Sequence, residues 1–127
     1  MKKILCIFIF LSLGLRSQNA DSLQLLLKAH PTEDTVRLNF LQLLTESIED
    51  ENEWPKYNEQ AFLLSQKLSK SDNEAISYKG KLGLSMALFN KGLVCYDKGE
   101  VANATDLFEK GLQQSQEIND KLGLSKA

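Results

Sequence analysis

Cysteine is scarce in this chain of 127 residues, which carries only Cys6 and Cys95. Cys6 lies inside an apolar N-terminal stretch, so a chain that loses this stretch keeps one thiol and can form no internal disulfide. Only two prolines and seven glycines are present, which is few for a disordered or a collagen-like chain. Packing of side chains is therefore expected to hold the fold together.

The chain also lacks an excess of basic residues. It has 15 lysines and arginines against 17 aspartates and glutamates, for a formal net charge of -2. Such a balance leaves no electrostatic footprint for nucleic acid, and no nucleic-acid partner is expected. With 43% hydrophobic and 25% charged residues, the composition is typical of one soluble domain.

Residues 1–20 resemble a secretory signal peptide. A positively charged start, MKK, precedes twelve apolar residues, ILCIFIFLSLGL, and Ser17 and Ala20 supply small residues for cleavage. The apolar stretch is too short to span a bilayer comfortably. We therefore expect export, with membrane contact only through this segment or one downstream of the chain. A buried N-terminal helix is the alternative.

From Asp21 onward the apolar residues recur at helical spacing, and no alternating pattern of a strand persists. A short apolar stripe ends at His30 and Pro31, since proline disfavours helix in the preceding residue. Four helices are expected after it. Thr32 or Asp34 is expected to cap the first, Pro55 to start the second, and Ser71 or Asp72 to cap the third, while the fourth starts at about Val101. The third is expected to run to about residue 96 and the fourth to about residue 118. The expected fold class is all-α.

The apolar stripes also predict which residues each helix buries. In the helix that follows Pro31 they are Val36, Phe40, Leu43, Leu44 and Ile48, and in the helix that starts at Pro55 they are Tyr57, Ala61, Leu64 and Leu68.

An internal repeat connects the middle of the chain with its end. KLGLSMA at 81–87 and KLGLSKA at 121–127 share six of seven residues at a distance of forty. A second echo relates SQKLS at 65–69 to SQEIN at 115–119, with about ten extra residues near 70–79. A period of this length that contains two helices is typical of a helical solenoid.

Residues 87–112, ALFNKGLVCYDKGEVANATDLFEKGL, resemble the tetratricopeptide repeat (TPR) family. The family pattern is W-x2-L-G-x2-Y, then A-x3-F, a small residue and proline. Gly92 takes the glycine, at which the first helix is expected to let its partner helix approach closely. Ala104 and Phe108 take A-x3-F, and Gly111 takes the small position. The remaining four positions depart from the pattern, with Leu88, Lys91, Cys95 and Gln116 in place of the tryptophan, leucine, tyrosine and proline.

This resemblance implies a TPR-like α-solenoid of antiparallel helical hairpins over residues 21–127. It would comprise a divergent hairpin at 35–69, the best repeat at 81–118 and the start of another repeat at 121–127, where the array is cut off. A repeat buries its apolar face against the next one. The side of the last helix around Leu107 and Leu112 is therefore expected to stay exposed and to cause self-association.

The resemblance also implies a concave groove for a protein or peptide, lined by the first helix of the best repeat. The groove-facing residues carried over are Met86, Phe89, Asn90, Leu93, Tyr96 and Asp97. Phe89 and Leu93 could instead pack against the neighbouring helix A, which is the first helix of the adjacent repeat. Family members that bind a free carboxylate use Lys, Asn and Arg at these places, and Met86, Phe89 and Leu93 depart from that set.

No pattern in the chain predicts catalysis, a cofactor or a metal. His30 is the single histidine and is expected at the surface, where one ligand makes no metal site. Cys95 is expected to be a buried structural thiol, with no histidine nearby in sequence to activate it. The acidic run at 49–53 lacks the glycine and the spacing of a calcium loop and is expected to be a solvated turn.

The sequence therefore predicts a non-catalytic protein-binding scaffold on the periplasmic or extracellular side of a bacterial membrane. An alternative is the ligand-sensing N-terminal region of a larger membrane signalling protein, such as a sensor kinase or a transcriptional regulator, of which bacterial TPR regions often form part. A hydrophobic span of about 20 residues encoded downstream of Ala127 would favour this alternative.

Overall fold

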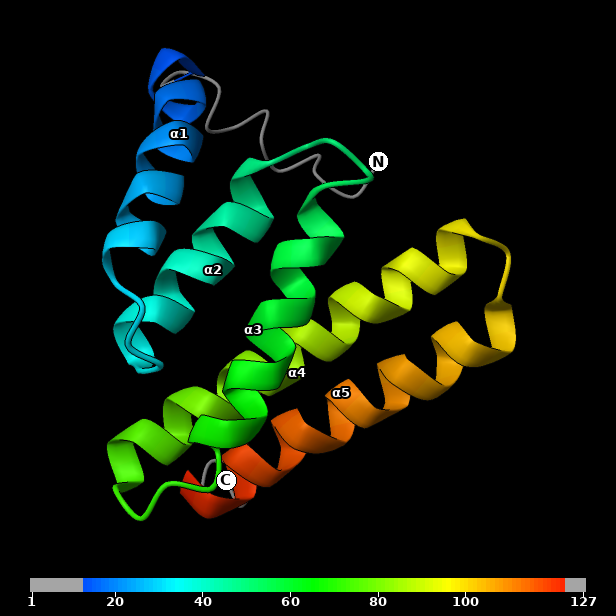
Figure 1. Ribbon diagram of the computed structural model, residues 1–127. Helices are drawn as coiled ribbons and strands as arrows, with labels where there is room; N and C mark the ends of the chain where they lie inside the picture. Colours follow the sequence, from blue (N-terminus) through cyan, green and yellow to red (C-terminus); the bar gives the residue numbers. More distant parts are fainter. Residues whose placement is uncertain (1–12, 123–127) are drawn as a thin grey trace.

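The protein forms five α-helices, as seen in a computed structural model that describes the backbone of residues 13–122 and the side chains of residues 20–119 (Figure 1). No strand occurs among the described residues, and the all-α prediction is confirmed. The helices are α1 (Leu13–Ala29), α2 (Thr35–Ser47), α3 (Trp54–Leu68), α4 (Glu74–Asp97) and α5 (Val101–Leu122).

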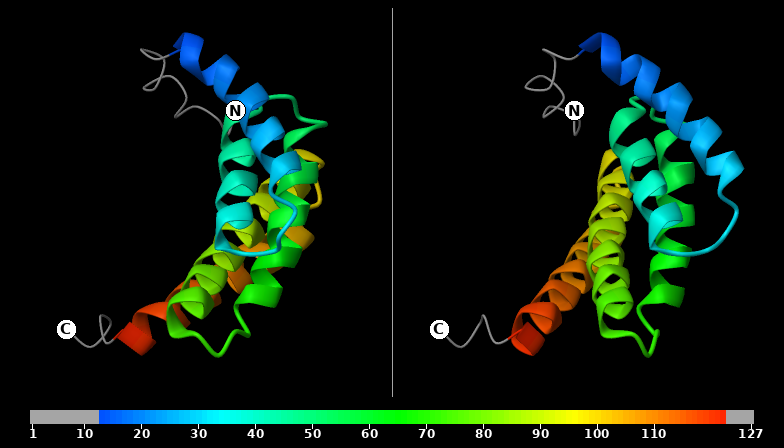
Figure 2. Two further views of the ribbon diagram at one scale, coloured as in Figure 1. Left: turned by 60° about the vertical axis from the view of Figure 1, so that its left-hand side comes forward. Right: turned by 90° about the vertical axis from the view of Figure 1, so that its left-hand side faces the viewer.

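The helices pack in chain order, each against the next, and α2 also touches α4. α2 and α3 form one antiparallel hairpin and α4 and α5 form a second, while α1 lies along α2 (Figures 1 and 2). The first helix of the second hairpin is the longer one, with 24 residues in α4 against 22 in α5. α4 therefore has one neighbouring hairpin on one side and its own partner helix on the other.

Short polar signals fix the ends of the helices. α1 ends at Ala29, two residues before Pro31, and the Asp34 carboxylate caps α2 by accepting a hydrogen bond from the Arg37 amide at 3.0 Å. α4 is capped by Asn73, which accepts from the Ile76 amide, and the predicted cap at Ser71 or Asp72 is wrong. Ser71 instead accepts a hydrogen bond from the Asn73 amide and so shapes the turn that positions the cap.

The main apolar core lies where α1, α2 and α3 meet. It consists of Leu23, Leu27, Leu38, Leu41, Leu44, Ala61, Leu64 and Leu68, with Phe40, Ile48, Tyr57 and Ile76 packed around it. Two residues of the predicted α2 stripe lie outside it, because Val36 and Leu43 are 46% and 42% exposed. Helical spacing fits both the stripe that contains Val36 and Leu43 and the stripe that contains Leu38 and Leu41. Because α1 and α3 pack against the second of these, Leu38, Leu41 and Leu44 face inward.

Glycines allow α4 to lie close to its neighbours. A β-carbon on Gly80 would collide with the backbone of Leu68 and Ser69 at the end of α3. A β-carbon on Gly83 would meet the Ser65 hydroxyl at 2.5 Å. Because backbone cannot move aside as a side chain can, Gly80 sets the distance at which α4 crosses α3.

The structure differs from the sequence prediction at the end of the last helix. α5 continues through Leu122, so Lys121 and Leu122 end this helix and do not start a new repeat. No glycine or proline lies between Ile118 and Leu122, so no strong helix breaker interrupts this part of α5. Residues 123–127 of the predicted repeat start lie outside the described residues.

The predicted signal peptide falls partly outside the described residues, which begin at Leu13. α1 runs without a break through the predicted boundary at Ala20. Among the helices of residues 13–122, none combines the length and the hydropathy that crossing a membrane requires.

Candidate protein-binding face

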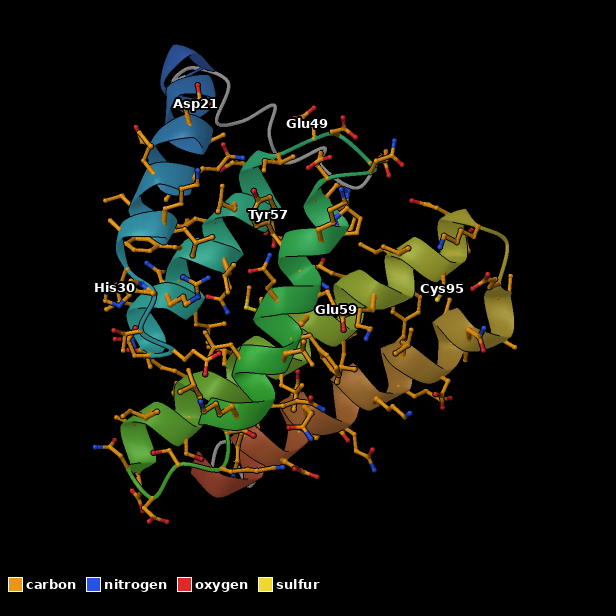
Figure 3. The ribbon with its side chains drawn as sticks, viewed as in Figure 1. Asp21, His30, Glu49, Tyr57, Glu59 and Cys95 are labelled. Carbon is orange, nitrogen blue, oxygen red and sulfur yellow. The ribbon has the colours of Figure 1, made fainter. Side chains whose placement is uncertain are left out.

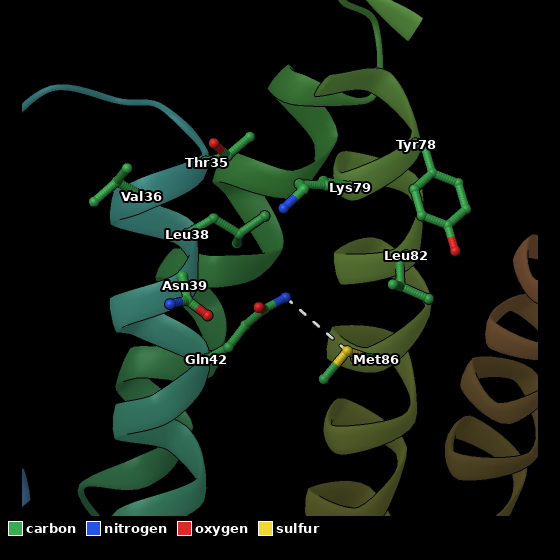
Figure 4. Close-up of a pocket in the computed structure, with 9 residues that line it drawn as sticks. All are labelled: Thr35, Val36, Leu38, Asn39, Gln42, Tyr78, Lys79, Leu82 and Met86. Carbon is green, nitrogen blue, oxygen red and sulfur yellow. Dashed lines mark hydrogen bonds between the residues drawn. The ribbon is translucent and has the colours of Figure 1, made fainter. Parts of the chain in front are cut away.

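A groove of about 470 Å³ runs between α2 and α4, which we call the α2–α4 groove (Figure 4). Its lining residues are Thr35, Val36, Leu38, Asn39 and Gln42 from α2, and Tyr78, Lys79, Leu82 and Met86 from α4.

The lining of the α2–α4 groove mixes apolar and polar groups. Val36, Leu82 and Met86 offer apolar surface, and Asn39 and Gln42 offer amides. The Gln42 amide nitrogen lies 4.0 Å from the Met86 sulfur, a weak contact that bridges the two helices (Figure 4). Lys79 is the one charged residue of this lining, and it makes no ion pair with any residue in the described part of the chain. The groove can therefore hold an apolar side chain beside polar backbone or an acidic group.

Two of the six groove residues predicted from sequence lie beside this groove. Met86 lines it directly. Asn90 lies one turn further along α4 and donates a hydrogen bond of 3.0 Å to the side-chain oxygen of Asn58. Asn58 is 3% exposed and donates in turn to the Ala87 carbonyl at 3.1 Å. The Asn90 amide therefore holds α3 against α4.

Phe89 turns toward α5. Its ring centroid lies 6.3 Å from that of Phe108, and its ring lies 3.3 Å from where a β-carbon on Gly111 would be. Phe89 nevertheless keeps 36% of its surface exposed. Phe89 therefore packs in part against the second helix of its own hairpin, whereas the alternative expected the first helix of the neighbouring repeat. Leu93 is half-buried.

The last two predicted residues lie at the C-terminal end of α4. Tyr96 is 59% exposed, and Asp97 is exposed beside the turn at Lys98 and Gly99. Gly99 has a φ of 81°, which glycine adopts without strain, and it ends the helix. The six predicted residues thus follow α4 and do not converge on one pocket.

A regular apolar pattern on α4 links most of these positions. Leu82, Met86, Phe89, Leu93 and Tyr96 follow one another at alternating steps of four and three residues, and we call them the α4 seam. This is the spacing at which one helix contacts another in a coiled coil. All five are exposed or half-buried, so this stripe faces away from the core.

Sequence reasoning missed the first half of the face. The TPR resemblance starts at Ala87 and assigns no role to Tyr78, Lys79 or Leu82. It also assigned no role to Val36, Asn39 and Gln42, because the first hairpin matches the family pattern poorly. The apolar residues that follow Leu82 at alternating steps of four and three were the signal in the sequence that could have revealed this half of the face.

Electrostatics gives no reactive group near this face. Cys95 is half-buried, and its pKa is raised first by desolvation and then by a hydrogen bond to Glu100, so the thiol stays protonated at neutral pH. It lies far from His30, which sits in the turn between α1 and α2 with its ring nitrogen 2.9 Å from an Asp34 oxygen (Figure 3).

The other polar groups considered from sequence have local partners. Asp50 accepts a hydrogen bond from the Asn52 amide at 2.7 Å and so closes the acidic turn. Within residues 20–119, no three His, Cys, Asp or Glu side chains come together in a way that could hold a metal ion. What the described side chains offer is a surface for contact.

Comparison of the chain with protein-family models, with curated proteins and with solved structures gives no match in any of the three.

Proposed function

We propose that the chain is a non-catalytic, TPR-like scaffold that binds a helical segment of a protein on the α4 seam and the adjoining α2–α4 groove. The observation that carries this proposal is the α4 seam itself, five apolar side chains at coiled-coil spacing that the core leaves uncovered. Apolar side chains in such a row are typical of a surface that another helix covers.

A helix fits this face better than an extended peptide does. Steps of four and three residues bring one side of α4 to a second helix turn after turn, whereas an extended chain presents side chains with a period of two. The α2–α4 groove then takes polar groups from the edge of that helix, through Asn39, Gln42 and Lys79.

Several contacts support the TPR-like part of the proposal. Two helical hairpins follow one another, and their first helices, α2 and α4, touch. Within the second hairpin, Gly92 lies against Phe108, and Ala104 is buried where the family pattern has its alanine. The apolar stretch near the N-terminus supports export, and we propose the periplasmic or extracellular side of a bacterial membrane as the location.

The proposal is tested with peptides selected from a random helical library against the full chain. Selected peptides, titrated into isotope-labelled protein, are expected to shift amide resonances along α4 and the facing side of α2. Leu82→Asp should abolish binding because it places a charge in the α4 seam. Leu63→Asp is the matched control, since Leu63 is 56% exposed on α3, outside this face.

Two results would contradict the proposal. One is a set of selected peptides that binds the Leu82→Asp variant as tightly as the parent chain. The other is a pattern of shifted resonances confined to α1, α3 and α5.

A further inference from the structure

The apolar surface of the α4 seam continues onto α5. Phe108 lies beside Phe89 of the seam, and Val101 and Leu112 lie seven residues before and four residues after Phe108 on the same side of α5. Val101 and Leu112 are 58% and 52% exposed. The self-association predicted from sequence relied on Leu107 and Leu112. Leu107 is half-buried, as is Phe108, and the exposed Val101 extends the surface that Leu112 and Phe108 form.

We propose that the helix that docks on the α4 seam is α4 of a second copy of this chain, in antiparallel orientation. The proposal deepens the proposed function and rests on it, since it identifies the partner of the same face. A two-fold axis through the seam makes both copies use the same residues. α5 of each copy then lies beside the pair and contributes Val101, Phe108 and Leu112, which completes a bundle of four helices.

The α4 seam is matched to itself in this orientation. With the axis between Met86 and Phe89, Leu82 faces Leu93 of the second copy, and Met86 faces Phe89 of the second copy. Each facing pair then joins a residue that is followed by a step of four with a residue that is followed by a step of three, which corresponds to the pairing of a with d positions in antiparallel coiled coils. The larger Phe89 ring meets the flexible Met86 side chain, which adapts its shape to the ring.

The charges at the two ends of the seam favour an antiparallel pair of copies. Lys79 and Asp97 are 18 residues apart, which is five full helical turns, so they project from the same side of α4. Neither has an ion pair with any residue that the structure describes. In this register each Lys79 lies opposite Tyr96 of the other copy and one residue along the helix from its Asp97, so the two charges come close twice by symmetry. Parallel docking would oppose like charges at both ends.

The size of the surface suits a dimer. α5 has 22 residues, so α4 and α5 side by side present a face roughly 33 Å long and 20 Å wide. The flat area of this face is roughly 650 Å², and the uneven surface of the side chains adds to it. A standard stable interface buries about 800 Å² per partner. The seam itself carries no charged side chain, so no charge is buried without a partner at its centre.

Substitutions that swap the charges of Lys79 and Asp97 test the orientation of the two copies as well as the existence of the dimer. Sedimentation equilibrium of the full chain should give a dimer, and Lys79→Glu or Asp97→Lys alone should raise its dissociation constant roughly tenfold by setting like charges against each other. An equimolar mixture of the two single variants should form a heterodimer at least as tight as the parent dimer, because both end contacts are then between opposite charges. The double variant should recover the homodimer for the same reason.

The matched control is Lys110→Glu. Lys110 pairs with Asp106 on the exposed side of α5, so its substitution changes the net charge by as much as Lys79→Glu does but leaves the seam untouched. Its dissociation constant should stay within about twofold of the parent value, since rim charges far from the contact have little effect.

Each outcome bears on the second copy separately from the proposed function. A parent chain that stays monomeric at several hundred micromolar, or single variants that do not recover on mixing, overturns the antiparallel dimer. If selected peptides still bind the α4 seam of such a monomer, the proposed function stands and only the identity of the partner falls. If neither a second copy nor any peptide binds the seam, both proposals fall.

Discussion

Gly92 of α4 lies directly against the ring of Phe108 on α5. A β-carbon at Gly92 would come within 2.6 Å of one ring carbon of Phe108 and 2.7 Å of the next. The prediction that Gly92 marks a close approach of two helices is therefore confirmed. The same ring lies beside Phe89, so this contact sets how the second hairpin presents the α4 seam.

Gly92→Ala should destabilise the protein by about 1–3 kcal/mol, because the added methyl group forces the Phe108 ring away from its site. The free energy of unfolding in urea measures this. Gly111→Ala is the control, since its β-carbon would lie 3.3 Å from the Phe89 ring and needs a smaller shift. There the gain in helix propensity, up to about 1 kcal/mol, should offset most of the strain. Equal stability of the Gly92→Ala variant and the parent would show that α5 is not held this closely.

Two buried serines on neighbouring hairpins should respond oppositely to alanine. The Ser65 hydroxyl is fully buried and has no hydrogen-bond partner among the described residues, whereas the Ser85 hydroxyl donates to the Gly111 carbonyl and contacts the Ser115 hydroxyl. Ser65→Ala should raise the melting temperature, because an unsatisfied buried hydroxyl costs about 1–3 kcal/mol.

Ser85→Ala should lower the stability by about 1 kcal/mol through loss of its hydrogen bonds. The pair is compared by thermal melting under one set of conditions. If Ser65→Ala is the more damaging substitution, the Ser65 hydroxyl has a hydrogen-bond partner in solution, and the packing of α3 against α4 near Gly83 differs from that described.

The cap of α2 should make stability depend on pH in the acid range. The pKa of Asp34 is lowered, first by the hydrogen bond from the Arg37 amide and then by the hydrogen bond from His30. A carboxyl group whose pKa is lower in the folded state stabilises the fold fully above its unfolded pKa of about 3.9. This contribution is lost as the pH falls through the folded-state pKa, because protonation then favours the unfolded chain.

Asp34→Asn isolates this effect, since asparagine also caps helices but does not titrate. Urea unfolding between pH 6 and pH 2 should show a shallower loss of stability for the variant than for the parent. Some loss should remain, because the pKa of Glu33 is also lowered, by its contact with Lys67. Identical pH profiles for the two proteins would mean that Asp34 does not cap α2 as its carboxylate.

Local features predicted from sequence were reliable where one residue type had one physical role. Pro31 stops a helix, Gly92 allows close approach, and Ala104 is buried on its helix. Each follows from the backbone or the size of a single side chain. Trp54 directly follows the acidic run at 49–53 but is 1% exposed, because α3 begins at this residue and turns it inward.

The proposed binding face was harder to predict because it depends on which helices meet. On α2, spacing alone could not choose between the stripe with Val36 and Leu43 and the stripe with Leu38 and Leu41. On α4, spacing alone could not decide whether Leu82 faces the core or the solvent. Its apolar side chain is typical of a core residue in sequence but is 41% exposed in the structure. The choice follows from the crossing of α4 over α3 at Gly80, a contact between distant segments that no local pattern contains.

Asn90 should act on stability more than on binding, although its place in the TPR pattern suggests contact with a partner. Its amide donates to the side-chain oxygen of Asn58, and the Asn58 amide already donates to the Ala87 carbonyl. Asn90→Ala would leave the buried Asn58 oxygen without this donor, at a cost of about 1–3 kcal/mol. Asn39→Ala is the control, because Asn39 lines the α2–α4 groove with its side chain exposed.

The two asparagines should therefore separate on two measurements. Asn90→Ala should lower the free energy of unfolding measured in urea. A selected peptide should bind the folded variant with a dissociation constant within about threefold of the parent value. That change is smaller than the tenfold change that corresponds to about 1.4 kcal/mol. Asn39→Ala should leave stability within about 0.5 kcal/mol of the parent, as is usual at an exposed site, and weaken the peptide instead. The reverse result, a stable Asn90→Ala variant that no longer binds, would place Asn90 on the binding face and free Asn58 to pair elsewhere.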